Sequence, residues 1–408
     1  MVSLGYRVRA LPSGPALRPG DRRSIAKSWG YCKGLAINRV GLPCRSIATK
    51  TNEPAVERRR RPPAGPSSHS STWAIASTNS HELRTTVVDV FIRIRTALSE
   101  LYLTMQTHFA TVSRAGIAAM EPLIRPYIRL TPMLDLDGVL LKFESMQVSG
   151  SFKARGAFAN LVTRTIPPAG VVAASGGNHG AAVAYAATRL NIPCRIYVPD
   201  ISSPAKIERI RATGADLRIV SGAYPDALRA SITDAAERGA MTVHAFDQVE
   251  TILGAGSVGM EMEDVARFDT VLVPVGGGGL IAGVSAWFSG RVRVVGVEPE
   301  GAPTLDWALR AGAPVTAPTG SLASDSLAAG ALGSLVYPIV ARFVERAILV
   351  SDDDIRAARE QLWNQGRVIA EPGGATAFAA LLSRKYEPAS GERVAVIVSG
   401  GNTVVSWT

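Results

Sequence analysis

The chain has 408 residues, which is too long for one hydrophobic core and predicts about two to three domains. Hydrophobic residues make up 47% and charged residues 19%, a composition typical of a folded protein with a well-buried interior. The net charge of +10 comes from residues 1–110, which hold 17 Lys and Arg against 6 Asp and Glu, whereas the rest of the chain sums to −1. The near-neutral charge of residues 111–408 excludes a general affinity for nucleic acids. A membrane span is also excluded, because the apolar runs are far shorter than the roughly 20 residues that a bilayer requires.

Residues 1–105 form a basic leader rich in Arg, Pro, Ser and Gly, which we expect to be mostly disordered. Within it, Val87–Tyr102 has apolar residues at helical spacing. The first 50 residues have a composition like that of a transit peptide. The alternative is an overlong start with a true beginning near Met105 or Met120, which the helix-breaking prolines and glycines of the leader favour.

From about residue 110, short β-rich runs alternate with longer helical patterns. This rhythm predicts an α/β fold with mainly parallel, open sheets covered by helices on both faces. Ligands of such sheets bind beyond the carboxyl ends of the strands. Strands are expected at Leu140–Phe143, Gly170–Ala174, Cys194–Pro199, Asp216–Val220, Thr270–Val275, Val292–Val297 and Val394–Val398, and helices at Ala154–Arg164, Ala181–Leu190, Pro204–Ala212, Tyr224–Arg238 and Ile355–Gln365.

The first chemical motif is Ser149–Lys153, between the first expected strand and the first expected helix. A lysine at a helix start faces the positive end of the helix dipole, which favours the neutral amine and lowers its pKa. Only the neutral amine attacks an aldehyde, so Lys153 is a candidate nucleophile. An ordinary surface lysine would give the same pattern, and this motif alone favours that simpler interpretation.

The second motif, Ser175–Gly180, follows a strand and opens a helix. Its backbone N–H groups can hold a carboxylate or a phosphate. Asn178 can donate to a phenolate-like oxygen or cap the helix, and His179 can act as a base or serve a structural role.

The third motif is the run Gly276–Gly279, a tetraglycine turn between a strand and a helix that lets the backbone wrap a phosphate. The strict GxGxxG spacing of a dinucleotide site fails in every frame, so a single-phosphate ligand fits better than NAD. A fourth turn, Ser399–Asn402, follows the final expected strand and is a weak signal by itself.

Together, in this order, the four motifs resemble those of the fold-type II pyridoxal-phosphate enzymes, specifically the group of threonine/serine dehydratases and serine racemase. The resemblance covers roughly residues 110–408. It implies a two-domain fold with a large cofactor-binding domain of residues 106–169 and 248–408 and a small domain of residues 170–247. It also implies a homodimer or higher homo-oligomer acting on a small amino acid.

The resemblance assigns roles to individual residues. Lys153 would hold pyridoxal 5'-phosphate covalently, Phe152 would pack on its ring, Asn178 would bond its 3-oxygen and Ser399 its pyridine nitrogen. Glu371 matches a glutamate near the cofactor. Phosphate binding falls to Gly276, Gly277, Gly278 and Gly279, and substrate carboxylate binding to the backbone of Ser175, Gly176, Gly177, Asn178 and His179.

A hydroxyl facing the pyridine nitrogen does not hold that nitrogen protonated, so the cofactor would be a milder electron sink and would suit expulsion of a β-hydroxyl. The resemblance therefore implies α,β-elimination, with Lys153 removing the Cα proton. The products would be a 2-oxo acid and ammonia.

Two positions depart from relatives within the resemblance. Racemases have a serine acid/base where this chain has Gly176, which disfavours racemisation. Some members bind a divalent cation through a glutamate, a carbonyl and an aspartate; Glu298 and Ala302 match the first two, but Thr304 stands in place of the aspartate. We therefore expect no metal.

Several alternatives stay open from the residues alone. The substrate could be another β-substituted amino acid, such as a hydroxyaspartate or a phenylserine. A serine racemase-like enzyme, or a regulatory protein that binds the cofactor without catalysis, would keep the same motifs. The three cysteines, Cys32, Cys44 and Cys194, show no disulfide or zinc spacing and favour a reducing, cytoplasmic location, with organelle targeting by the leader left open.

Overall fold

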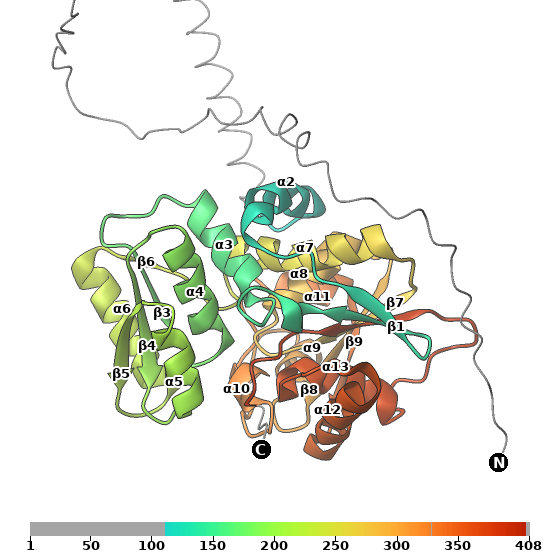
Figure 1. The fold of residues 1–408 in the computed structure, drawn as a ribbon. Coiled ribbons are helices and arrows are strands. Elements are labelled where there is room, and N and C mark those ends of the chain that lie inside the picture. The colour runs from blue at the N-terminus through green and yellow to red at the C-terminus, as the bar shows by residue number, and fades with distance from the viewer. Residues whose placement is uncertain (1–110, 328, 405–408) are drawn as a thin grey trace, which may run out of the picture. The chain divides into compact units, whose positions relative to one another are not determined.

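The computed structural model describes residues 111–327 and 329–404, shown as coloured ribbon in Figure 1. The leader and the helix expected at Val87–Tyr102 lie outside the described residues. In the described part of the chain, no helix is both long enough and apolar enough to span a membrane.

The larger sheet has six strands in the order β1-β2-β10-β7-β8-β9. All neighbouring pairs are parallel except β1 and β2, which form an antiparallel edge. In this order β10, the last of the described strands, lies inside the sheet, where Val396 pairs with Leu141 of β2 on one side and with Leu272 of β7 on the other. The strands are β1 Met133–Leu136, β2 Val139–Phe143, β7 Thr270–Pro274, β8 Arg293–Pro299, β9 Val344–Val350 and β10 Val394–Val398.

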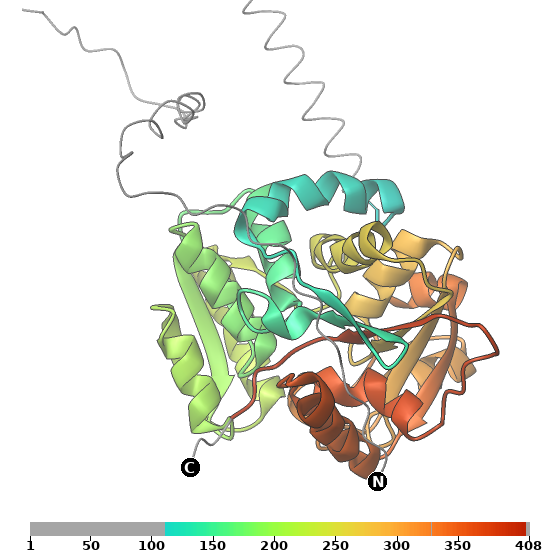
Figure 2. The same ribbon diagram turned by 45° about the vertical axis from the view of Figure 1, so that its right-hand side comes forward.

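The smaller sheet has four parallel strands in the order β5-β4-β3-β6. Helices α4 and α6 both pack against β3 and β4, and all four residues of β3 are buried. This sheet (green in Figures 1 and 2) is therefore also covered on both faces. Its strands are β3 Val171–Ala174, β4 Cys194–Pro199, β5 Asp216–Val220 and β6 Met241–Thr242.

Local sequence explains where several helices begin and end. Helix α12 begins at a capping box between Ser351 and Asp354, with acidic residues in its first turn. Helix α6 ends at Gly239, whose φ of 64° suits glycine. The α-helices are α2 Arg114–Ile124, α3 Lys153–Thr163, α4 Asn178–Arg189, α5 Pro204–Arg211, α6 Tyr224–Arg238, α7 Val249–Val265, α8 Gly279–Phe288, α9 Thr304–Ala311, α10 Ser324–Leu327, α11 Tyr337–Phe343, α12 Asp352–Gly366 and α13 Pro372–Leu382; the 3-10 helices are η1 Arg125–Tyr127 and η2 Glu144–Met146.

Two hydrophobic cores lie on opposite faces of the large sheet. One joins the sheet to α7 and α8 and continues to α3, α4 and the small sheet, and the other joins it to α12 and α13. Figures 1 and 2 show these helix pairs, yellow and orange-red, on the two sides of the strands. Successive residues of a strand alternate between the cores: Val271, Val273, Ala395 and Ile397 face the first, and Leu272, Val396 and Val398 face the second.

The expected α/β class with mainly parallel sheets is confirmed, and the expected strands match β2, β3, β4, β5, β7, β8 and β10. Strands β1, β6 and β9 were not predicted from the sequence, and neither were helices α2, α7, α9, α10, α11 and α13. Strands from residues 171–242 form the small sheet and the others form the large one. The division into domains at residues 169/170 and 247/248 stays a prediction.

Candidate active site

A cavity of about 400 Å³ contains residues from three of the four motifs. Lys153 lines it from the start of α3, the turn Ser175–His179 from the end of β3, and Gly277 from the end of β7. Its position at the carboxyl ends of parallel strands is where α/β folds bind ligands. The remaining lining residues are Ala174, Pro199, Ile201, Ser202, Lys206, Tyr224, Leu228, His244, Ala245, Phe246, Ser324, Asp325, Ser326 and Ala329.

Lys153 presents a primary amine to this cavity. Burial lowers the pKa of the Lys153 amine to about 8, against an opposing effect of the nearby Glu371 carboxylate. Its Nζ donates to the carbonyl of Ala245 at 2.7 Å and lies 4.9 Å from the centre of the Phe152 ring. A lowered pKa was expected from the helix dipole, and in the structure its largest cause is burial. A substantial share of neutral amine near pH 8 suits a nucleophile.

The turn Ser175–His179 offers fewer free donors than the sequence predicted. The N–H of Ser175 donates to the Tyr197 carbonyl at 2.9 Å, and that of Gly177 donates to the Ser175 hydroxyl at 3.1 Å. The N–H groups of Gly176, Asn178 and His179 have no acceptor within the described chain. Of the five backbone N–H groups expected to bind a carboxylate, only those of Gly176, Asn178 and His179 are therefore free to do so.

His179 has its side chain buried beneath the same turn. Its Nε2 lies 2.9 Å from the carbonyl of Val243, which can only accept, so this nitrogen carries the proton. Burial, together with the charge of Lys153, lowers the pKa of His179 to about 3. The ring is therefore neutral at physiological pH, and this arrangement favours the structural interpretation of His179 over that of a base.

The Asn178 amide is held by hydrogen bonds on both sides. Its Nδ2 donates to Glu371 Oε1 at 2.5 Å, and its Oδ1 accepts from Asn402 Nδ2 at 2.7 Å. Asn402 also donates to the Ser149 carbonyl at 2.9 Å. Burial raises the pKa of Glu371 to about 7, although the bond from Asn178 opposes this effect. Asn402, to which the sequence analysis gave no role, thus fixes which end of the Asn178 amide donates.

The fourth motif lies directly against the first. The Phe152 N–H donates to the Ser399 carbonyl at 3.1 Å, and the Gly401 N–H donates to the Gly150 carbonyl at 2.9 Å. Ser399 is buried, and its hydroxyl makes one long contact, 3.4 Å, with the Gly373 carbonyl. Ser399 is therefore adjacent to Lys153 through the backbone, although it does not line the cavity itself.

The tetraglycine turn is packed so closely that side chains would not fit. A Cβ on Gly277 would overlap the Phe246 ring, and one on Gly276 would meet the backbone of Leu327. Gly278 has a φ of +86°, which favours glycine on conformational grounds as well. Glycine at these positions brings the backbone itself to the cavity wall at Gly277.

Glu298, the weak metal candidate, binds the start of α9 instead. Its carboxylate accepts from the N–H groups of Leu305 at 2.7 Å and Asp306 at 2.9 Å, and the Thr304 hydroxyl lies 2.8 Å from it. Burial raises the pKa of Glu298 to about 7 against those hydrogen bonds. The described residues contain no group of three or more His, Cys, Asp or Glu side chains arranged to hold a metal ion; Ala302, the other candidate, packs in the core.

A buried cluster of four charged side chains, which was not predicted from the sequence, joins Arg155 of α3 to three neighbouring elements. We call Lys142, Glu144, Arg155 and Glu261 the buried charge cluster; none is more than 2% exposed. Arg155 bonds both carboxylates at 2.7–2.9 Å, and Lys142 bonds Glu261 at 2.7 Å. Although burial opposes ionisation, the bonds from Arg155 and Lys142 lower the pKa of Glu261 to about 2. The cluster joins β2 and η2 to α3 and α7, and so anchors the helix that carries Lys153.

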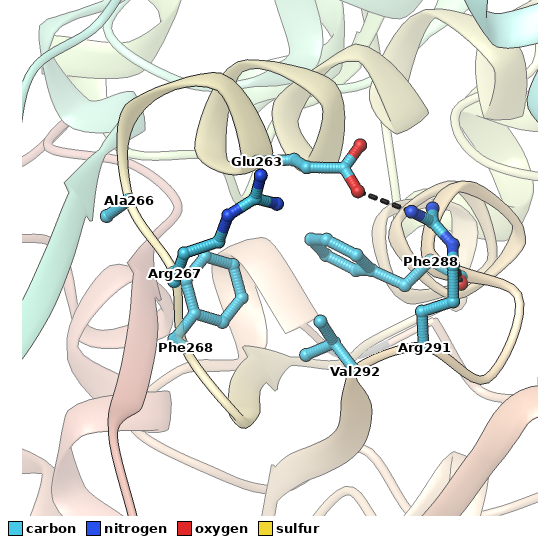
Figure 3. A pocket seen from close by; sticks show the side chains of 7 residues that line it. All are labelled: Glu263, Ala266, Arg267, Phe268, Phe288, Arg291 and Val292. Atoms are coloured by element: carbon cyan, nitrogen blue, oxygen red, sulfur yellow. Dashed lines mark hydrogen bonds and ion pairs between the residues drawn. The ribbon is translucent and has the colours of Figure 1, made fainter.

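A second cavity, of about 260 Å³, lies where α7 and α8 end (Figure 3). Its lining includes Phe268, Phe288 and the ion pair between Glu263 and Arg291. It shares no lining residue with the first cavity and contains none of the four motifs. The candidate active site is therefore the larger cavity around Lys153.

Comparison with known proteins identifies the family. Residues 124–400 match the family model described as "Pyridoxal-phosphate dependent enzyme". The chain belongs to this family. Pyridoxal phosphate is therefore its cofactor, and the architecture is that of the two-domain fold-type II enzymes.

Relatives within the family include both dehydratases and racemases. A phenylserine dehydratase from Ralstonia pickettii is 37% identical over 306 residues, covering 71% of this chain and 93% of the relative. An L-threonine ammonia-lyase from Thermotoga maritima is 35% identical over 274 residues, covering 66% of this chain and 68% of the relative. The structure of maize serine racemase superposes with a TM-score of 0.68 at 31% identity, covering 72% of this chain and 95% of that one.

The residues of the cavity fit this cofactor. An aldehyde condenses with a neutral amine, which the lowered pKa of Lys153 favours, and a phosphate binds well to exposed backbone N–H groups, which the tetraglycine turn can present at Gly277. Asn178 supplies an oriented amide, and the Ser399 hydroxyl is held by only one long contact.

Proposed function

We propose that the protein is a dehydratase of the threonine/serine ammonia-lyase type, which converts a small β-hydroxy amino acid to a 2-oxo acid and ammonia by α,β-elimination. The observation that carries the proposal is one cavity that contains the Lys153 amine, the oriented Asn178 amide, the Gly277 backbone and a turn with free N–H donors. When bound, pyridoxal phosphate supplies the electron sink that makes the Cα proton of an amino acid removable.

The proposed division of labour follows from the contacts. Lys153 holds the cofactor covalently and, once released, takes the Cα proton; burial favours the neutral form of its amine, which is the form that can accept a proton. Asn178, held by Glu371 and Asn402, orients the ring, and Ser399 provides a neutral partner for the pyridine nitrogen. The free N–H groups of Gly176, Asn178 and His179 bind the substrate carboxylate. Loss of the β-hydroxyl as water leaves an unsaturated amine product, and hydrolysis of that product gives the 2-oxo acid and ammonia.

A phenylserine is the second candidate substrate, and a specific feature of the cavity favours it. Ile201, Tyr224 and Leu228 form an apolar part of the lining, and Ile201 and Tyr224 are 74% and 42% exposed. Exposed apolar side chains at a cavity are a place for an apolar substituent of a ligand. The Ralstonia pickettii relative is named for a phenylserine substrate.

One assay panel tests the proposal. The purified full chain, saturated with pyridoxal phosphate, is incubated with L-threonine, L-serine, 3-hydroxyaspartate and phenylserine, and 2-oxo acid and ammonia are measured together. We expect equal amounts of both, with threonine or serine as the best substrate. Bound cofactor without any 2-oxo acid would contradict the proposal and favour a non-catalytic binding protein. Chiral chromatography of the remaining serine detects racemisation, which we expect to be slower than elimination.

A further inference from the structure

A serine from another loop fills the space beside Gly176. Gly176 does not have a positive φ, so its backbone conformation suits any residue. A Cβ at this position would nevertheless overlap the Ser202 hydroxyl and lie 3.0 Å from Ser202 Cβ and 3.1 Å from Val198 Cγ1. Glycine at position 176 therefore makes room for the Ser202 hydroxyl.

The Ser202 hydroxyl is free to bind a ligand. Its backbone is anchored, because the Ser202 N–H donates to the Pro199 carbonyl at 3.0 Å after the end of β4. Its Oγ has no hydrogen-bond partner within residues 111–327 and 329–404, although both Ser202 and Gly176 line the cavity around Lys153. Ser202 is half-buried, and its hydroxyl can therefore form a hydrogen bond with a ligand in the cavity.

The charges nearby favour a neutral donor at this place. Lys206, the other cation of the cavity lining, is paired with Asp325. A carboxylate bound at the turn Ser175–His179 thus meets the N–H groups of Gly176, Asn178 and His179 rather than a free ammonium. A carboxylate has about four acceptor positions, which leaves one for a further donor.

We propose that Ser202 is a substrate-binding residue whose hydroxyl donates to the substrate carboxylate beside Gly176. The inference rests on the proposed function, since it assumes an amino-acid substrate in this cavity. It assigns carboxylate recognition to two segments, the turn after β3 and the loop after β4. The loop after β4 would then contribute to substrate affinity and not to the chemical step.

A binding titration tests this role without turnover. L-alanine, which has the carboxylate but no β-hydroxyl to expel, is titrated into the full chain with bound pyridoxal phosphate while the absorbance of the cofactor is followed. We expect Ser202→Ala to raise the Kd of L-alanine roughly ten- to hundredfold, the effect of one hydrogen bond to a charged group. The KM for threonine or serine should rise similarly, with a smaller change in kcat.

Two controls separate this role from a structural one. Ser203→Ala alters the adjacent, exposed serine that does not line the cavity, and it should leave the Kd unchanged. L-alaninamide has an amide in place of the carboxylate, so its affinity should change little in Ser202→Ala. An unchanged Kd for L-alanine, or an equal loss for both ligands, would overturn the proposal.

Exchanging the side chains of residues 176 and 202 tests their contact without the cofactor, through the melting temperature of the protein. Gly176→Ser alone should lower the melting temperature, because its Cβ overlaps the Ser202 hydroxyl, and Ser202→Gly in the same chain should restore it. If no 2-oxo acid forms from any substrate, the proposed function fails, whereas the L-alanine titration still decides the role of Ser202.

Discussion

Replacing Arg155 with methionine should destabilise the protein far more than the loss of an ordinary ion pair. Arg155 is fully buried and donates five hydrogen bonds, to Glu144, Glu261 and Ser257. Without it, Glu261 keeps its bonds from Lys142 and from Arg125 at the rim, whereas Glu144 keeps only the hydroxyl of Thr131. Removing one partner of a buried ionic network costs about 3–5 kcal/mol, because the remaining charges stay desolvated and unpaired.

Urea unfolding of the cofactor-bound full chain measures this loss as a shift in midpoint. Arg211→Met, whose Glu208 partner and own side chain are 65% and 56% exposed, is the matched control and should cost less than about 1 kcal/mol. The double variant Arg155→Met/Glu144→Leu should be more stable than Arg155→Met alone, since it removes one of the stranded carboxylates. Equal losses for Arg155→Met and Arg211→Met would refute the reasoning.

Three further predictions concern the site. Lys153→Ala should abolish the visible absorbance of covalently bound cofactor and reduce 2-oxo acid formation by at least about 10²-fold; retention of the absorbance band would count against Lys153. Gly277→Ala should weaken pyridoxal phosphate binding in an equilibrium titration, because its Cβ overlaps the Phe246 ring, and an unchanged Kd would argue against phosphate binding at the turn. The rate at which cofactor-free protein takes up pyridoxal phosphate should rise about tenfold per pH unit below the Lys153 pKa of about 8 and level off above it, since only the neutral amine reacts; a flat profile between pH 6 and 8 would contradict the lowered pKa.

Seven of the ten described strands were predictable, because buried parallel strands tend to be short apolar runs between turn residues. Val394–Val398 shows this pattern without interruption and has the expected bounds, and Cys194–Pro199 also has the expected bounds although it contains Arg195. Helix α13 was not predicted, since it begins with Pro372 and two glycines and most of its residues are buried, so no polar face marks its period. Strand β6, at two residues, is too short to show any pattern.

The glycine turns Ser175–Gly180, Gly276–Gly279 and Ser399–Asn402 could be recognised because each follows a strand, and the first two also precede a helix. The contacts that complete the site join residues far apart in the chain, and no local pattern records them. Asn402 and Asn178 are one example, and Ser202 and Gly176 are another. Arg155 lies two residues after Lys153, but its two carboxylate partners come from η2 and α7, which only the fold brings together.

The place of β10 within the large sheet has a consequence for biosynthesis. Residues Val394–Val398 are inserted between β2 and β7, so β2 has no parallel neighbour until these residues have left the ribosome. The Ser399–Asn402 turn, which contacts Phe152 and Asn178, arrives in the same step. Long-range parallel pairing of this kind is slow. The facing edges of β2 and β7 therefore stay unpaired, and open to aggregation, until β10 enters the sheet and the cavity forms.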